Sequence, residues 1–90
     1  MMDFDENACE ENTARTLDYE GVADTYDQAL DWVRDIHDHF ELAYDVGETF
    51  EERERFLQEK GYPQKAIDAV VEEWDIKSWE WDKPLSERQD

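Results

Sequence analysis

The chain has 90 residues, enough for one small domain and too few for two. Its 27 acidic and nine basic residues give a formal net charge of −18. With this charge we do not expect direct binding to nucleic acid or to an anionic membrane without a bridging cation, because both would repel the protein.

The first 24 residues give the weakest structural signals in the chain. Residues 1–12 carry five acids and no base, with little periodicity, and we expect a flexible acidic arm there, or a short helix if something docks it. Residues 13–24 are compatible with either a helix or a strand. The stretch 16–19 is the candidate strand, and Gly21 would interrupt either element.

A clear helical pattern begins at residue 25, and it predicts a long amphipathic helix over about 25–44. Thr25 or Asp24 can cap its first turn, and Gly47 is suited to end it. The apolar side chains recur at helical spacing on one face, which we expect to be buried. The main members of this face are Leu30, Val33, Ile36 and Phe40.

Two shorter helices are predicted over about 50–60 and 63–75. Thr49 and Glu52 form a capping box at the start of the first of these helices, Gly61 is the expected stop, and Pro63 suits the first turn of the next helix. The side chains expected in their buried faces are Phe56, Leu57, Ile67, Val70 and Trp74.

The C-terminal segment contains a short period-two alternation over residues 76–81, which favours a short β-strand or an extended arm. Residues 84–90 follow Pro84 and are expected to form a loose tail. The predicted fold class is therefore mainly α. It consists of one helical domain over 13–83 with three principal helices, and it leaves room for one short β element near the C-terminus.

The excess negative charge is concentrated in the first part of the chain. Residues 1–52 hold 17 acids and two bases, whereas residues 53–90 hold 10 acids and seven bases. Within the long helix the acids recur every three or four residues and share one face, opposite the apolar one. The members of this acidic face are Asp24, Asp27, Asp31, Asp35, Asp38, Glu41 and Asp45.

This acidic face opposes the stability of its own helix. Like charges one turn apart destabilise a helix by ~0.2–0.5 kcal/mol per pair, and only Arg34 lies near enough to relieve the repulsion. Aspartate is also a poorer helix former than glutamate. We therefore weigh a partner-binding surface equally against the alternative of an ordinary solvated face.

Enzymatic and metal chemistry have little support in the sequence. The chain has no glycine-rich phosphate loop, nucleophile elbow or HExxH motif, so we expect no enzyme and no cofactor. His37 and Glu41 stand four residues apart and could hold a metal ion. Two histidines on one helical turn are more often structural, and we expect no metal site.

Three tryptophans lie close together near the C-terminus: Trp74, Trp79 and Trp81. Closure of the core would explain a cluster of this kind. An exposed tryptophan is also a frequent anchor of protein interfaces. We therefore count Trp79 and Trp81, together with the acidic face, among the candidate partner-binding residues.

The acidic face resembles that of DNA-mimic inhibitors from phages and mobile elements. These include anti-restriction proteins, uracil-DNA glycosylase inhibitors and several anti-CRISPR proteins. The resemblance covers residues 18–52 and consists of charge placement. It implies an acidic inhibitor that blocks the basic groove of a DNA- or RNA-handling protein, such as a nuclease, a glycosylase, or a restriction or CRISPR component.

Two other interpretations stay open at this point. One is a helical adaptor that binds another protein through the C-terminal aromatic cluster. The other is a halophile's acidic protein, although halophilic acidity should spread over the whole surface. The lone cysteine, Cys9, and the absence of a signal-peptide pattern or a membrane-spanning run favour a cytoplasmic location, in the host cell if the source is a phage. The oligomeric state is open, and a homodimer is one option.

Overall fold

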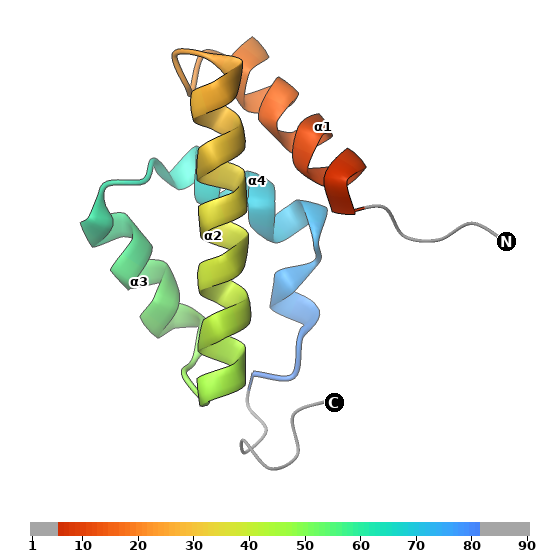
Figure 1. Ribbon diagram of the computed structural model, residues 1–90. Helices are drawn as coiled ribbons and strands as arrows, with labels where there is room; N and C mark the ends of the chain where they lie inside the picture. Colours follow the sequence, from red (N-terminus) through yellow and green to blue (C-terminus); the bar gives the residue numbers. More distant parts are fainter. Residues whose placement is uncertain (1–5, 82–90) are drawn as a thin grey trace, which may run out of the picture.

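The computed structural model describes residues 6–81, which form four helices and a short 3₁₀ turn (Figure 1). The elements are α1 (Glu6–Tyr19), α2 (Tyr26–Val46), α3 (Phe50–Lys60), α4 (Gln64–Glu73) and the turn η1 (Ile76–Ser78). The described part of the chain contains no strand. It also has no helix that is long and apolar enough to cross a membrane. The mainly helical fold class is thus confirmed, and the count of three principal helices is corrected to four.

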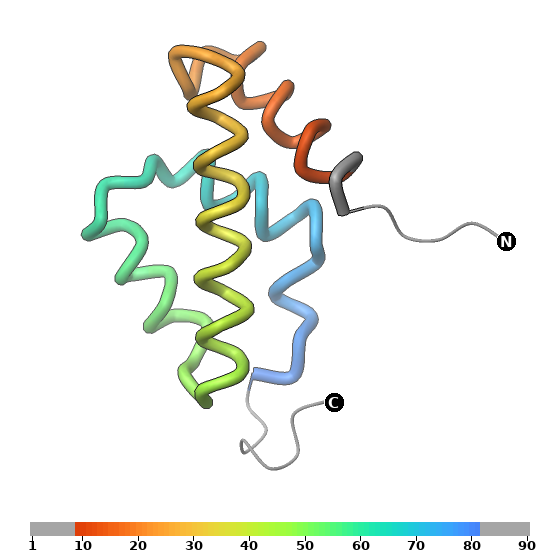
Figure 2. Tube along the Cα trace, viewed as in Figure 1, coloured from red at the N-terminus to blue at the C-terminus, as the bar shows by residue number. Residues whose placement is uncertain are grey.

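Helix α2 is the centre of the fold and contacts α1, α3 and α4 (Figures 1 and 2). Helix α1 runs beside its first half, α3 lies on the opposite side, and α4 passes behind it. Thr25 caps α2 by accepting a hydrogen bond from the backbone N–H of Gln28. Gly47 ends the helix in the left-handed conformation, at φ 88°. These are the start and stop signals that the sequence predicted.

Helix α1 replaces the ambiguous segment and the second half of the expected acidic arm. Among residues 9–19 of this helix, the buried side chains are those of Thr13, Ala14 and Leu17. A helix with so short an apolar stripe depends on docking for its stability, and α2 supplies the docking surface. Gly21 then reverses the chain at φ 78°. The rest of the expected arm, residues 1–5, lies outside the described residues.

Helices α3 and α4 form the predicted hairpin. Thr49 and Glu52 make both hydrogen bonds of the capping box, each 3.1 Å long. Gly61 ends α3 at φ 111°. Pro63 directly precedes α4 at the N-cap position, without a side-chain hydrogen bond and one residue before the N1 position expected for it. The capping and stop residues therefore set the boundaries of both helices.

The expected β element over 76–81 is wrong, because residues 76–78 form the 3₁₀ turn η1. Asp75 reverses the chain in the left-handed conformation at φ 50°, and Ile76 then inserts into the core with none of its surface exposed. No strand of the described chain is available to pair with this segment. The expected loose tail, residues 84–90, lies outside the described residues.

Most of the predicted core is buried. The fully buried members are Val33, Ile36, Phe40, Leu57, Ile67 and Val70. Leu30 and Trp74 are partly buried and pack against this core. Phe56 is a correction, because 46% of its surface is exposed. The inward positions of α3 belong to Phe50, Arg53 and Leu57, which leaves Phe56 at the rim.

Candidate functional site

Six of the seven predicted acidic residues form an exposed row along α2 and the residue before its cap. We call Asp24, Asp27, Asp31, Asp38, Glu41 and Asp45 the acidic row. Arg34 lies on the same face, but its guanidinium pairs with Glu10 of α1 at 3.0 Å. The row therefore presents carboxylates, while the nearby base is engaged at the side of the helix.

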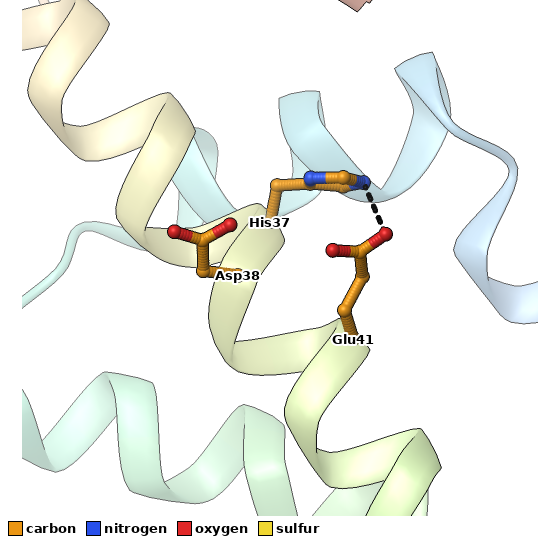
Figure 3. Close-up of side chains that lie close together, drawn as sticks. All are labelled: His37, Asp38 and Glu41. Carbon is orange, nitrogen blue, oxygen red and sulfur yellow. Dashed lines mark ion pairs between the residues drawn. The ribbon is translucent and has the colours of Figure 1, made fainter.

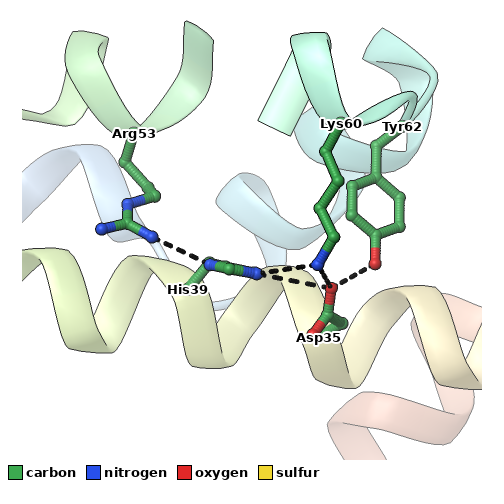
Figure 4. A network of polar contacts seen from close by, with 5 residues as sticks. All are labelled: Asp35, His39, Arg53, Lys60 and Tyr62. Atoms are coloured by element: carbon green, nitrogen blue, oxygen red, sulfur yellow. Dashed lines mark hydrogen bonds and ion pairs between the residues drawn. The ribbon is translucent and has the colours of Figure 1, made fainter. Parts of the chain in front are cut away.

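The seventh residue, Asp35, turns toward α3 and the turn that follows it (Figure 4). Its Oδ2 accepts hydrogen bonds from the Tyr62 hydroxyl and, at 3.1 Å, from Lys60 Nζ. Burial by itself raises the pKa of the Asp35 carboxyl, but these two donors outweigh it and hold the pKa below its ordinary value. Burial and the Asp35 hydrogen bond raise the pKa of Tyr62. Asp35 thus fastens α2 to the hairpin.

His39 lies between two cations in the same network (Figure 4). Arg53 Nη1 is 2.9 Å from its Nδ1, and Lys60 Nζ is 3.2 Å from its Nε2. Arginine and lysine can only donate, and a neutral imidazole has a single acceptor nitrogen, so the ring can accept a hydrogen bond from only one of these two cations. Nε2 also lies 3.5 Å from Asp35 Oδ2. Burial lowers the pKa of His39, and Lys60 and Arg53 lower it further, against the opposing effects of Asp35 and Asp38.

This arrangement predicts that His39 makes the fold sensitive to mild acid. Its contribution to stability is complete above its unfolded pKa, near 6.5, and is lost as the pH falls through its lower folded pKa. Between about pH 7.5 and about pH 5, the melting temperature should fall more steeply in the wild type than in His39→Gln. The comparison cancels the titration of the carboxylates, which both proteins share. An NMR titration giving His39 a folded pKa above 6.5 would contradict the prediction.

His37, Asp38 and Glu41 place three donor groups together on α2 (Figure 3). One ligand atom from each lies within 4.8 Å of the others. His37 is buried, its ring stacks on Trp74 with centroids 4.4 Å apart, and its Nε2 is 3.8 Å from Glu41 Oε2. A bound zinc would require metal–ligand distances of about 2.0–2.2 Å. The structure shows a His37–Glu41 contact across one helical turn, beside the further carboxylate of Asp38. The absence of a metal site stays a prediction.

The two candidate tryptophans lie at the C-terminal end of α2 and play different roles. Trp81 Nε1 donates a 2.8 Å hydrogen bond to the backbone carbonyl of Ile76, and its ring packs edge-on against Phe40 and Phe50. Trp79 stacks on Trp81, with centroids 5.7 Å apart and planes 19° apart. Trp81 therefore joins the cluster to the buried rings of Phe40 and Phe50, and Trp79 stacks on Trp81.

Two grooves flank Trp79. One, of about 480 Å³, is lined by Thr49, Phe50, Glu51, Lys77, Trp79 and Trp81. The other, of about 510 Å³, is lined by Glu41, Tyr44, Asp45, Trp79 and Glu80, and we call it the acidic groove. It joins the end of the acidic row to the aromatic cluster. The sequence analysis missed Tyr44, whose only signal was its place at the end of the apolar face.

Comparisons with protein-family models, with curated proteins and with solved structures found no match.

Proposed function

We propose that this protein is a non-enzymatic acidic inhibitor that occupies the basic, nucleic-acid-binding groove of a DNA- or RNA-handling protein. The observation that supports the proposal is the acidic row, six exposed carboxylates on the face of α2 away from its core. The neighbouring helices take up Asp35 and Arg34 through side-chain contacts and leave the row at the surface.

The dimensions of the row suit this role. At ~1.5 Å per residue, the stretch from Asp24 to Asp45 extends over roughly 30 Å, with one carboxylate per roughly 6 Å. A DNA strand presents a phosphate per ~3.4 Å of its axis. The row therefore offers about half the linear charge density of one strand, on a rigid helix that needs no ordering when it binds.

The overall charge favours rapid encounter with a basic partner. A net charge of −18 steers a basic surface toward the protein and raises the association rate, and salt screens this effect. Each row carboxylate would pair with a lysine or arginine that otherwise holds a phosphate. Binding of this protein and binding of nucleic acid should therefore exclude one another.

The test uses two variants with the same net charge. Asp24→Asn, Asp27→Asn, Asp31→Asn and Asp38→Asn together neutralise four positions of the row. The matched control carries Glu11→Gln, Glu59→Gln, Glu72→Gln and Glu73→Gln, four exposed acids outside the row. Each protein is immobilised and loaded at low salt with the DNA-cellulose-binding fraction of a lysate. Retained proteins are then eluted with a duplex oligonucleotide.

Wild type and matched control should each retain proteins that the duplex releases. The row variant should retain at least about tenfold less, because it lacks the carboxylates that would pair with the partner's lysines and arginines, which the control keeps. If the two variants retain equally reduced amounts of protein, the net charge of the chain, rather than the placement of the charges, causes retention. Retention that the duplex cannot reverse would contradict the proposal.

A helical adaptor is the second candidate, favoured by the half-buried Trp79 between two grooves. Trp79→Ala in the same assay separates the two functions. Loss of binding in Trp79→Ala, with the row variant still competing against DNA, would favour the adaptor. Trp81→Ala is less suitable, because Trp81 supports the aromatic cluster.

A further inference from the structure

We infer that the acidic groove is a recognition site for a single arginine side chain of a protein partner. The inference rests on the proposed function in one respect, namely that the partner is basic. It adds a defined site and a preferred residue, whereas the acidic row alone would attract any cation.

The walls of the groove form an aromatic corner. The rings of Tyr44 and Trp79 have centroids 5.5 Å apart and planes 71° apart, close to a right angle. A cation placed in such a corner meets the face of one ring and lies near the second. Cations bind most strongly to the faces of tryptophan and tyrosine. Both wall residues are partly exposed.

The corner is held in place before any ligand arrives. Trp81 stacks under Trp79 and also packs edge-on against Tyr44, with centroids 5.3 Å apart. Trp81 is in turn fixed by its hydrogen bond to Ile76, which is fully buried. A site ordered in this way loses little side-chain entropy on binding, which favours affinity.

The charges around the corner select a cation. Glu41 and Asp45 precede and follow Tyr44 on α2, and both line the groove. The last turn of α2 carries no basic residue, although the negative end of a helix dipole is where cations are normally placed. Asp45 even adds a negative charge there. A ligand guanidinium would supply the positive charge that this helix end does not receive from its own residues.

The neighbouring groove shows the contrast. It holds a cation of the protein's own, because Lys77 Nζ lies 5.7 Å from the centroid of the Phe50 ring. Among residues 6–81, the lining of the acidic groove combines two aromatic residues with carboxylates and includes no base. The same aromatic cluster thus presents one groove with an internal cation and another suited to an external one.

Arginine fits the acidic groove better than lysine. Its planar guanidinium can stack on the Trp79 face while its N–H groups donate in pairs to the carboxylate of Glu41 or Asp45. A lysine ammonium is a compact, strongly hydrated charge that cannot stack.

The test is an NMR titration of the full chain with acetyl-Gly-Arg-Gly-amide, followed at the Trp79 indole N–H and the Tyr44 ring. The lysine peptide and the neutral citrulline peptide, which keeps the shape of arginine without its charge, are run alongside. We expect saturable shifts at both rings with arginine, at least about threefold weaker binding with lysine, and no saturable shift with citrulline. Equal binding of arginine and citrulline would overturn the inference, as would shifts confined to the Phe50 and Lys77 groove.

Three variants locate the site. Glu41→Gln with Asp45→Asn keeps both rings and should weaken arginine binding at least fivefold, by roughly 1 kcal/mol on the usual conversion. Trp79→Leu should abolish it, whereas Lys77→Gln should leave it within about twofold. Should Trp79→Leu fail to fold, the carboxylate variant still decides, because unchanged affinity there would refute the charge argument.

The row variant separates this inference from the proposed function. None of its four substitutions lies in the groove lining, so its affinity for the arginine peptide should stay within about threefold of the wild type. A peptide that binds while the duplex fails to displace retained proteins would refute the mimic alone. Displacement by the duplex without binding of the peptide would refute the arginine site alone.

Discussion

Replacement of Phe40 with alanine should cost about 3–5 kcal/mol of unfolding free energy, a large part of the ~5–15 kcal/mol available to a domain of ordinary stability. Phe40 is fully buried on α2, stacks on Phe50 with centroids 5.1 Å apart, and meets the edge of Trp81. Its loss would leave a cavity where α2 meets the aromatic cluster. Urea denaturation followed by circular dichroism measures the change.

Phe56→Ala is the matched control, because it makes the same chemical change on a half-exposed residue. The Phe56 ring contacts His39 and lies under the Arg53 guanidinium at 5.0 Å, so some packing is lost. We expect a cost below about 1.5 kcal/mol, since much of the ring is already in water. Equal costs at the two positions would contradict the assignment of Phe40 to the core and Phe56 to the rim.

Salt should stabilise the folded protein. Four or five like-charged pairs one turn apart along α2 cost ~0.2–0.5 kcal/mol each, so screening them should recover roughly 1–2 kcal/mol. In a domain of this size that is a rise of roughly 5–10 °C in melting temperature between about 0.05 M and about 0.5 M NaCl. The effect exceeds the loss from screened surface ion pairs such as Arg34–Glu10, because exposed pairs contribute little.

The row variant and its matched control also serve here. Each has four fewer negative charges, but only the row variant relieves repulsion along α2, and its dependence on salt should be the weaker of the two. A melting temperature that stays flat in the wild type up to about 0.5 M NaCl would contradict the prediction. Sodium sulfate is unsuitable for the test, since it stabilises proteins by exclusion from their surface as well.

Local signals were sufficient to predict three of the four helices. Thr25, Gly47, Gly61 and the Thr49–Glu52 box each act within a few residues of the boundary that they set. The spacing of apolar residues likewise identified most of the buried face of α2.

Two elements depend on contacts that a one-dimensional pattern does not contain. Helix α1 has few buried apolar side chains and is ordered by packing on α2. The alternation at Trp79 and Trp81 resembled that of a strand, but these rings stack on each other after the reversal at Asp75. In both segments tertiary packing overrode the local preference.

In the candidate site, too, the features set by local spacing were predictable, and the contacts between distant parts of the chain were not. Helical spacing placed six carboxylates on one exposed face, which the structure has. It could not show that Asp35, at the margin of that face, would meet Lys60 and Tyr62 from a later part of the chain. Nor could it show that Tyr44 would meet Trp79, because that contact depends on the path of the chain through η1.

The packed aromatic rings and the helices give the protein two separate signals in circular dichroism, one in the near ultraviolet and one in the far ultraviolet. Aromatic rings contribute to the near-ultraviolet circular dichroism only while they are held in fixed, asymmetric packing, whereas the far-ultraviolet signal follows the helices. Trp79 and Trp81 lie at one end of the molecule, held by Ile76 and by the end of α2. Trp32 and Trp74 pack elsewhere, against Tyr62 and His37. A near-ultraviolet signal that fades before the far-ultraviolet one, and that changes in Trp79→Leu, would therefore indicate intact helices and a loosened tryptophan stack.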